Sequence, residues 1–396
     1  MSFTLSALRT SPNALASHYE KFRVKERLLF TGHSHQAWPD CGFQAQAQAW
    51  LDAAEHVDDK WTFAFAQADR VRDGYARLLN DTDGDITLGV NTHELLVRWL
   101  SALPLQRRPR LVTTDGEFHT IRRQLARLQE EGLEVVVIPS APGDSVAERL
   151  SAALDDRTAA VLVSAVFYRD ARIVDGLDAL LSVCQRVGAE LLVDAYHALG
   201  AIPFSLSAQK LGAAFVVGGG YKYCQLGEGN AFLRSPPGCR LRPLVTGWFA
   251  EFGLLGASAA IVGYGEGGLR FAGATYDPTS HYRGAAVFDF FEAHGLTPEF
   301  LRTVSQHQVN RLRDRFDSLD ADPATIARDT CTPRAQFAGF LALETPHAAA
   351  LTDALRRRGV MSDQRQNSLR LGPAPYLSDD QLDRAIDALG DALASL

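Results

Sequence analysis

The stretch Leu-Leu-Val-Asp-Ala-Tyr-His at residues 191–197 combines a short apolar run with a carboxylate at its end. A continuous apolar run of this length is typical of a parallel strand that is covered on both faces. Ligands of open α/β sheets bind outside the carboxyl ends of the strands. We therefore expect Asp194 to lie at a pocket.

A second apolar run, Ala-Phe-Val-Val at residues 214–217, leads through three glycines to Tyr221 and Lys222. Glycines allow a backbone to approach a ligand closely, and a lysine placed after them can form a Schiff base. Asp194, His197 and Lys222 thus bring a carboxylate, an imidazole and an amine to positions where an aldehyde cofactor can use all three.

Strands and helices alternate around these two runs, which predicts an α/β fold with a mostly parallel sheet flanked by helices. We expect strands at residues 110–113, 134–138, 160–166, 191–194 and 215–218, and helices at residues 45–54, 66–79, 94–103, 120–131, 146–154 and 177–187. A helical stretch over 281–319, broken around 295–298, precedes strands at 340–343 and 368–371 and a last helix over 378–396.

The length of 396 residues, of which 46% are hydrophobic, suits one large domain and a smaller one. We expect an N-terminal arm at residues 1–45, with a short helix over 12–22 and a strand over 27–30. A large domain is expected at 46–280 and a smaller α+β domain at 281–396.

Charge and cysteine usage restrict the partners and the compartment. The net charge of -7 and the dispersed arginines argue against nucleic acid as a partner. The five cysteines are scattered without a CxxC pair, which argues against a disulfide framework or a thiolate zinc site. No basic leader precedes an apolar core and no apolar run is long enough to cross a bilayer, so we expect a cytoplasmic protein without membrane contact.

Pyridoxal phosphate (PLP) requires a lysine, a carboxylate for its ring nitrogen, an aromatic plane and donors for its phosphate. Lys222 and Asp194 meet the first two needs, and His197 is expected beside the ring. Phe118 follows the strand over 110–113, where a strand-to-helix loop can place its ring over the cofactor. The segment with Asn91, Thr92 and His93 precedes a helix, whose N-terminal N–H groups suit a phosphate.

These segments, with Tyr-Lys-Tyr at 221–223 and Gly-Glu-Gly at 227–229, resemble the cofactor-binding core of kynureninases, in the class V aminotransferase branch of fold-type I PLP enzymes. The resemblance implies a fold-type I homodimer with active sites at the interface. It also implies roles for Trp248 and Thr275 at the phosphate, the latter contributed across the interface. Arg370 is implied to bind the α-carboxylate of the substrate, which His33, Ser34 and His35 also face.

The resemblance further implies a PLP-dependent hydrolase that acts on kynurenine or 3-hydroxykynurenine-like amino acids. In such a reaction Lys222 removes and returns protons, and Tyr221 contacts the phosphate and assists proton transfer. Water adds to the side-chain carbonyl, and cleavage of the β–γ carbon bond releases an aromatic acid and alanine. No metal ion takes part.

This chain departs from the family pattern mainly near the substrate. His33 and His35 stand where the family has Asn and Leu, and Ile121 stands where an acidic residue usually follows the stacking Phe. Arg365 and Arg370 are also one residue closer together than in the family motif. The substrate is therefore less well defined than the cofactor.

Three alternatives remain open. Lys222 and Asp194 equally serve a class V aminotransferase or a β-eliminating lyase acting on another amino acid. His33 and His35 form a His-x-His pair after a strand, which is compatible with a metal-dependent hydrolase. A non-catalytic module that binds PLP is the third alternative.

Overall fold

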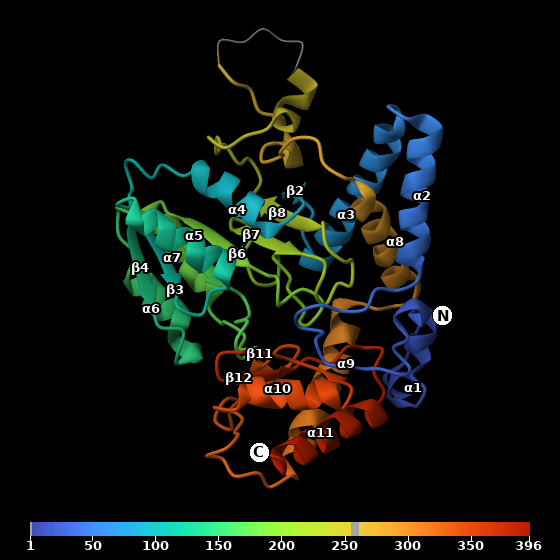
Figure 1. The fold of residues 1–396 in the computed structure, drawn as a ribbon. Helices are drawn as coiled ribbons and strands as arrows, with labels where there is room; N and C mark the ends of the chain where they lie inside the picture. The colour runs from blue at the N-terminus through green and yellow to red at the C-terminus, as the bar shows by residue number, and fades with distance from the viewer. Residues whose placement is uncertain (1, 255–260) are drawn as a thin grey trace.

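The computed structural model describes residues 2–254 and 261–396 and contains a seven-stranded central sheet (Figure 1). The strand order is β2-β8-β7-β6-β5-β3-β4. The five strands from β7 to β4 in this order are parallel, and β8 runs antiparallel to both β7 and β2. The strands span Asp85–Gly89 (β2), Arg110–Thr114 (β3), Glu134–Ile138 (β4), Thr158–Ser164 (β5), Glu190–Asp194 (β6), Phe215–Gly219 (β7) and Ala231–Ser235 (β8). The predicted α/β class with a mostly parallel sheet is confirmed.

Two helical layers cover the sheet because successive strand residues point to opposite faces. On one face Leu192 packs in a core cluster with residues of α4 (Thr92–Ser101) and α5 (His119–Glu130). On the other face its neighbour Val193 packs with residues of α6 (Val146–Ala152) and α7 (Leu177–Val187). The same alternation in β5 and β7 explains why these strands are apolar throughout.

A group of three helices stands at one side of the sheet in Figure 1, where α8 packs against α2 and α3. The helices span Cys41–His56 (α2), Lys60–Leu79 (α3) and Thr279–Ala293 (α8). Gly74 permits the close approach of α3 and α8, because a Cβ there would lie 2.2 Å from the Phe288 ring. The single helix expected over 12–22 is instead two 3-10 turns, Ala14–His18 and Glu20–Phe22, after a short α1 at Leu5–Arg9.

The C-terminal elements lie below the sheet in Figure 1. They comprise α9 (Pro298–Asp317), α10 (Ala348–Arg357), α11 (Asp379–Leu393) and an antiparallel sheet of order β11-β12-β9, with bounds Asp363–Arg365, Ser368–Leu371 and Leu341–Glu344. The expected Ser-x-x-Gln start of the last helix is a capping box between Ser378 and Gln381. The N-terminal arm joins this part through parallel pairing of β1 (Leu28–Leu29) with β10 (Val360–Met361). The domain boundaries stay a prediction.

Short 3-10 turns complete the described structure, at Gly143–Ser145, Trp248–Leu254, Gly267–Leu269 and Arg334–Gln336. Across the described ranges, none of the helices has the length and apolar character needed to cross a bilayer.

The hydrophobic pattern of the sequence did not predict β8, because this strand contains an arginine that forms a buried ion pair. Arg234 interrupts the apolar alternation of β8, yet its Nε and Nη2 donate to the carboxylate of Asp81 at 2.6 and 2.9 Å. Its Nη1 donates to the carbonyls of Gly212 and Ala214 at 2.8 and 2.9 Å. A charge buried in this way is compatible with the strand because its donors find acceptors.

We expect Asp81→Asn to lower the free energy of unfolding by about 3 kcal/mol, because it leaves the buried Arg234 charge without its carboxylate. Chemical denaturation followed by circular dichroism measures this loss. Asp83→Asn, in the exposed part of the same turn, is the matched control and should change stability by less than about 0.5 kcal/mol. Equal effects of the two substitutions would contradict the assignment.

Candidate functional site

The predicted cofactor residues gather at the carboxyl edge of the sheet. Asp194 ends β6, Lys222 follows β7, Phe118 lies between β3 and α5, and Asn91 lies between β2 and α4. These segments line a cavity of about 290 Å³, together with Val90, Thr92, His93, Thr120, Tyr196, His197, Tyr221, Glu228, Gly229 and Ala231. Strands far apart in the chain thus deliver their loops to one place, as the parallel order requires.

Lys222 is the centre of this cavity. Its Nζ lies 2.9 Å from Nε2 of His197, 4.6 Å from the ring centre of Tyr196 and 5.2 Å from that of Phe118. Burial lowers the pKa of Lys222, the charge of Asp194 acts in the opposite direction, and Arg370 and Arg365 lower it further. The amine is therefore held nearer to its neutral, nucleophilic form than a surface lysine.

Burial also shifts the pKa values of Asp194 and His197, in opposite directions. Burial raises the pKa of Asp194, while a 2.8 Å hydrogen bond from the Tyr196 N–H and the charge of Lys222 lower it. Burial is also the main cause that lowers the pKa of His197 well below its usual value, followed by Lys222. A neutral imidazole can accept a hydrogen bond from the amine, so His197 holds Lys222 without adding a charge.

The N-terminus of α4 forms another wall of the cavity. The side chain of Asn91 caps this helix by accepting a 2.9 Å hydrogen bond from the Glu94 N–H. Asn91, Thr92 and His93 line the cavity, and their role at a phosphate stays a prediction. The positive end of the α4 dipole therefore faces the same space as Lys222.

Side chains of the protein pack against the three glycines at the end of β7 and directly after it. A Cβ at Gly218, Gly219 or Gly220 would lie 2.8, 2.3 or 2.5 Å from the side chains of Phe232, Tyr196 or Leu226, respectively. Side chains of the protein itself therefore approach the backbone here, and the close approach of a ligand to these glycines stays a prediction. They let Tyr196 lie against β7 beside Lys222.

Arg370 lies on β12 in a buried network of the C-terminal part. Its Nε and Nη2 donate to both oxygens of Asp363 at 2.9 and 2.6 Å, and Nη1 donates to the carbonyl of Tyr168. Nε2 of the buried His33 lies 2.7 Å from Oδ1 of the same carboxylate. Burial lowers the pKa of His33 to about 4, so the ring is neutral at neutral pH and donates to Asp363 as a hydrogen-bond partner.

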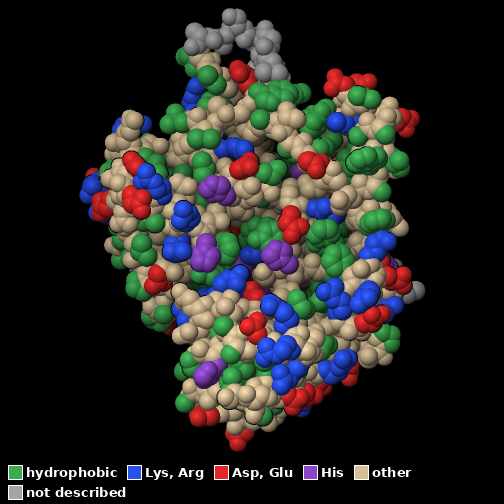
Figure 2. Space-filling view, viewed as in Figure 1, with side chains coloured by type: hydrophobic (Ala, Val, Ile, Leu, Met, Phe, Trp, Pro, Cys, Tyr) green, Lys and Arg blue, Asp and Glu red, His purple; other side chains and the backbone are tan. Residues whose placement is uncertain are grey.

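The predicted residues of the loop after β1 face two different parts of the structure. His33 points to Asp363, whereas His35 stacks on Tyr221 of the Lys222 cavity with ring centres 5.1 Å apart. Ser34 bonds to His35 at 3.1 Å. Figure 2 shows exposed histidine side chains at the middle of the face, between the part above that holds the sheet and the C-terminal part below, whereas His33 is fully buried and is not among them. The two histidines therefore do not act as a pair.

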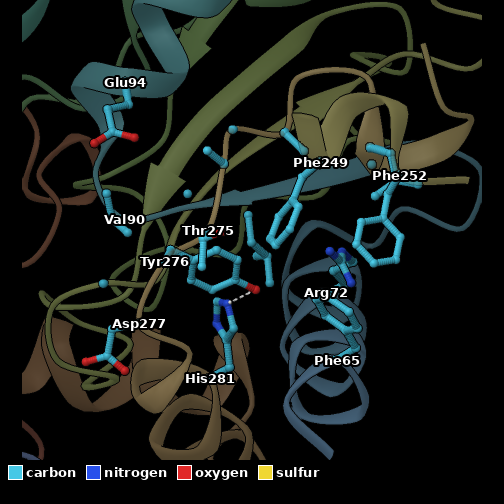
Figure 3. Close-up of a pocket in the computed structure, with 18 of the residues that line it drawn as sticks. Phe65, Arg72, Val90, Glu94, Phe249, Phe252, Thr275, Tyr276, Asp277 and His281 are labelled. Carbon is cyan, nitrogen blue, oxygen red and sulfur yellow. Dashed lines mark hydrogen bonds between the residues drawn. The ribbon is translucent and has the colours of Figure 1, made fainter. Parts of the chain in front are cut away.

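Two of the predicted cofactor residues, Trp248 and Thr275, do not line the Lys222 cavity, nor do the predicted substrate residues His33, Ser34, His35 and Arg370. Thr275 lines a second cavity of about 710 Å³, and Trp248 is 43% exposed and contacts Phe249 and Phe252, which line that cavity too (Figure 3). Tyr276 and His281 form part of its wall, and Nε2 of His281 lies 3.0 Å from the hydroxyl oxygen of Tyr276. Val90 and Gly229 line both cavities, so the two adjoin.

Three residues of the site were not assigned by sequence reasoning. Tyr196 lines the cavity beneath Lys222, Asp363 holds Arg370, and Glu117 is a buried carboxyl group next to Phe118. Glu117 lies in a strand-to-helix turn at a sheet edge, which was a usable signal. The Asp363–Arg370 contact spans two paired strands, and a single sequence does not reveal that register.

Among the described residues, no group of side chains supplies further ligands for a metal ion at His33 and His35. Among residues 2–254 and 261–396, three or more His, Cys, Asp or Glu side chains are nowhere grouped so that they could hold a metal ion. His33 and His35 also face different partners.

Comparisons with known proteins agree with this geometry. The Kynureninase C-terminal domain family matches residues 301–389. The chain is 26% identical over 379 residues to the uncharacterized aminotransferase YcbU of Bacillus subtilis, covering 92% of this chain and 96% of the relative. It is 27% identical over 402 residues to the kynureninase of Pseudomonas fluorescens, covering 96% and 93%.

A solved structure of a C-DES mutant, with glycine covalently linked to its PLP cofactor, has the same fold. The TM-score is 0.80 at 17% identity, and the match covers 95% of this chain and 99% of that chain. Sequence and structure thus agree over nearly the whole length. The chain is thus similar to kynureninases and to the aminotransferase YcbU over nearly its whole length, and it shares the fold of the PLP-linked C-DES structure.

Proposed function

We propose that the protein is a PLP-dependent hydrolase of the kynureninase type. It cleaves the β–γ carbon bond of kynurenine or 3-hydroxykynurenine-like amino acids, with water, to an aromatic acid and alanine. The observation that carries the proposal is the meeting of Lys222, Asp194 and His197 in one buried cavity. The kynureninase relative, matched over 96% of this chain, supports the reaction type.

The donor set of the cavity fits PLP. Lys222 supplies an amine for the aldehyde, Asp194 a carboxylate for the ring nitrogen, and Phe118 an aromatic wall. Asn91, Thr92 and His93 present the N-terminus of α4 to a phosphate, and Tyr221 lies beside it in the same cavity. When bound, PLP supplies an electron sink that stabilises negative charge developing on the substrate.

The residues of the chain divide the remaining tasks. Asp194, as a buried carboxylate of the cavity, would favour a proton on the ring nitrogen of a bound cofactor. Lys222, whose pKa is lowered by burial, accepts a proton from the α-carbon and returns it. Tyr221 has its pKa raised by burial and stays a phenol, which can donate to the phosphate or pass a proton.

Arg370 is the proposed partner of the substrate carboxylate. A guanidinium has five N–H groups. Three atoms of Arg370 already donate to Asp363 and Tyr168, so two N–H groups remain for an incoming carboxylate. Asp363 thereby orients the guanidinium before substrate arrives, which reduces the entropy lost on binding.

We propose a cytoplasmic homodimer with sites at the interface. In this chain Thr275 lines the cavity that adjoins the Lys222 cavity, not the Lys222 cavity itself. This placement supports the inference that Thr275 serves the phosphate of a second copy. Trp248, partly exposed and in contact with Phe249 and Phe252 of the same cavity, is assigned to the same interface.

A second candidate is transamination or β-elimination on another amino acid. The match to the aminotransferase YcbU covers 92% of this chain and supports it. His33 and His35 also make the substrate loop of this chain different from that of kynureninases. Product analysis with L-kynurenine and 3-hydroxykynurenine separates these reactions: alanine and an aromatic acid support hydrolysis, whereas a keto acid supports the second candidate.

Lys222→Ala should abolish the visible absorbance of lysine-bound PLP in the purified protein, because the other side chains of the cavity offer no primary amine. Absorption spectra with added PLP measure this. Lys25→Ala, at an exposed position, is the control and should keep the absorbance. An unchanged absorbance in Lys222→Ala would exclude the proposed attachment.

Asp363→Asn should lower the free energy of unfolding by about 2 kcal/mol at neutral pH, since it weakens the charged hydrogen bonds to Arg370. Its contacts with His33 and Arg370 help hold the pKa of Asp363 below its usual value. This contribution is present above the unfolded pKa and is lost as the pH falls through the folded pKa. The stability difference from wild type should therefore shrink in acid, as measured by denaturant unfolding at several pH values.

Asp353→Asn is the matched control, since Asp353 forms an exposed ion pair with Arg356 on α10. It should change stability by less than about 0.5 kcal/mol. The same Asp363→Asn protein should also show a higher KM for the amino acid with a smaller change in kcat. A KM equal to that of wild type would contradict the role of Asp363 in orienting Arg370.

A further inference from the structure

Glu117 is a buried carboxyl group to which the proposed reaction assigns no task. It lies in the turn between β3 and α5, one residue before Phe118. Its Oε1 accepts hydrogen bonds from the Thr114 hydroxyl at 2.7 Å and the Ser164 N–H at 3.2 Å. Its Oε2 accepts one from the Ser164 hydroxyl at 2.6 Å. None of these donors carries a charge.

The hydrogen bonds bring Glu117 to the strand beside Asp194. Ser164 ends β5 and pairs in register with Asp194, which ends β6. Burial is the main cause that raises the pKa of Glu117 to about 7, and the charge of Asp194 raises it further, while Ser164 and Thr114 lower it. The charge of Asp194 therefore acts on Glu117 across adjacent strands.

Glu117 also anchors the turn that carries Phe118. Phe118 is the N-cap residue of α5, and this helix has no side-chain capping hydrogen bond. The turn is tied to β5 through Glu117 instead, and within itself through the Gly116 N–H, which donates to the Thr114 hydroxyl at 3.2 Å. Because the Phe118 ring lies 5.2 Å from Nζ of Lys222, the turn determines where this aromatic wall stands.

We propose that Glu117 is a positioning residue of the Lys222 cavity, which fixes the turn carrying Phe118 and supplies a second carboxyl charge beside Asp194. The role toward the cofactor rests on the proposed function. Ile121, at the position where the family has an acid, is buried in the core beneath α5. The second carboxyl group of this chain thus comes from the residue before Phe118.

The charged and titratable neighbours set the direction of the effect. Asp194 and His197 lie at and beyond the end of β6, Tyr221 and Lys222 lie after β7, and Arg365 and Arg370 act on Lys222 from the C-terminal part. An ionised Glu117 adds negative charge at the end of β5, where Ser164 pairs in register with Asp194. It should therefore stabilise the cationic form of the nitrogen of Lys222.

The first test is a pH titration of the visible absorbance of the PLP-loaded protein. In Glu117→Gln, which is isosteric and cannot ionise, the midpoint should move to lower pH by about one unit. Glu190→Gln is the matched control, because Glu190 is a partly buried carboxyl at the opposite end of β6. Its midpoint should equal that of wild type.

The second test does not depend on PLP. The pKa of Glu117 in the folded protein, about 7, lies above the value of 4.5 for an unperturbed glutamate. The stability that the protonated form contributes is present below the unfolded pKa and is lost as pH rises through the folded pKa. The Tm of Glu117→Gln should therefore rise relative to wild type between about pH 5 and pH 8.

Two further variants keep the proposal decidable. Ser164→Ala removes a donor that lowers the pKa of Glu117, so its spectral midpoint should move in the same direction as in Glu117→Gln. Glu117→Ala also loses the hydrogen bonds of the turn and should weaken PLP binding about tenfold more than Glu117→Gln. These variants give an answer even when one of them does not fold.

The outcomes separate the two proposals. Absence of visible absorbance in wild type overturns the proposed function, and the Tm comparison then still decides the charge of Glu117. Visible absorbance with the same midpoint and the same relative Tm in Glu117→Gln and Glu190→Gln overturns the charge assigned to Glu117. Equal PLP affinity of Glu117→Ala and Glu117→Gln overturns its role in placing Phe118.

Discussion

The burial of an amine beside a carboxylate at the edge of the sheet is the constraint on which the site depends. Removing Lys222 and Asp194 from water disfavours the charged form of each, and their mutual attraction offsets part of that cost. His197, kept neutral by burial, adds a hydrogen bond to the amine without another charge. Such a pair is poised for proton transfer and covalent attachment, which ordinary surface residues are not.

The remainder of the fold places partners around this pair. Parallel strands deliver Phe118, Asp194 and the segment before Lys222 to one edge, and the antiparallel β8 lies between β7 and β2. The C-terminal part contributes Arg370, oriented by Asp363 and by the neutral His33. Pairing of β1 with β10 attaches the N-terminal arm to that part, so that the loop with His33 and His35 reaches both Asp363 and Tyr221.

Pattern and composition predicted most strands of the sheet because a strand buried on both faces is apolar throughout. The same reasoning missed β2 and β8. In β8 the buried Arg234 looks like a surface residue until its partner Asp81, 153 positions away in sequence, is known. The glycines at the end of β7 were assigned to ligand contact because a glycine in the sequence indicates a backbone that other atoms can approach closely. The sequence does not show which atoms approach it. In the structure Tyr196 and its neighbours fill that space.

Local sequence patterns were enough to predict the α/β class, five of the seven strands of the central sheet, and the placement of Asp194 and Lys222 after apolar runs. These features follow from local periodicity and from the polarity of single residues, which one chain displays directly. Three contacts became known only from the folded chain: Glu117 binds Ser164 on the strand beside Asp194, Asp363 binds Arg370, and His33 and His35 face different partners. Those contacts depend on strand register and on burial, because a side chain acquires its pKa and its hydrogen bonds from residues that are distant along the chain.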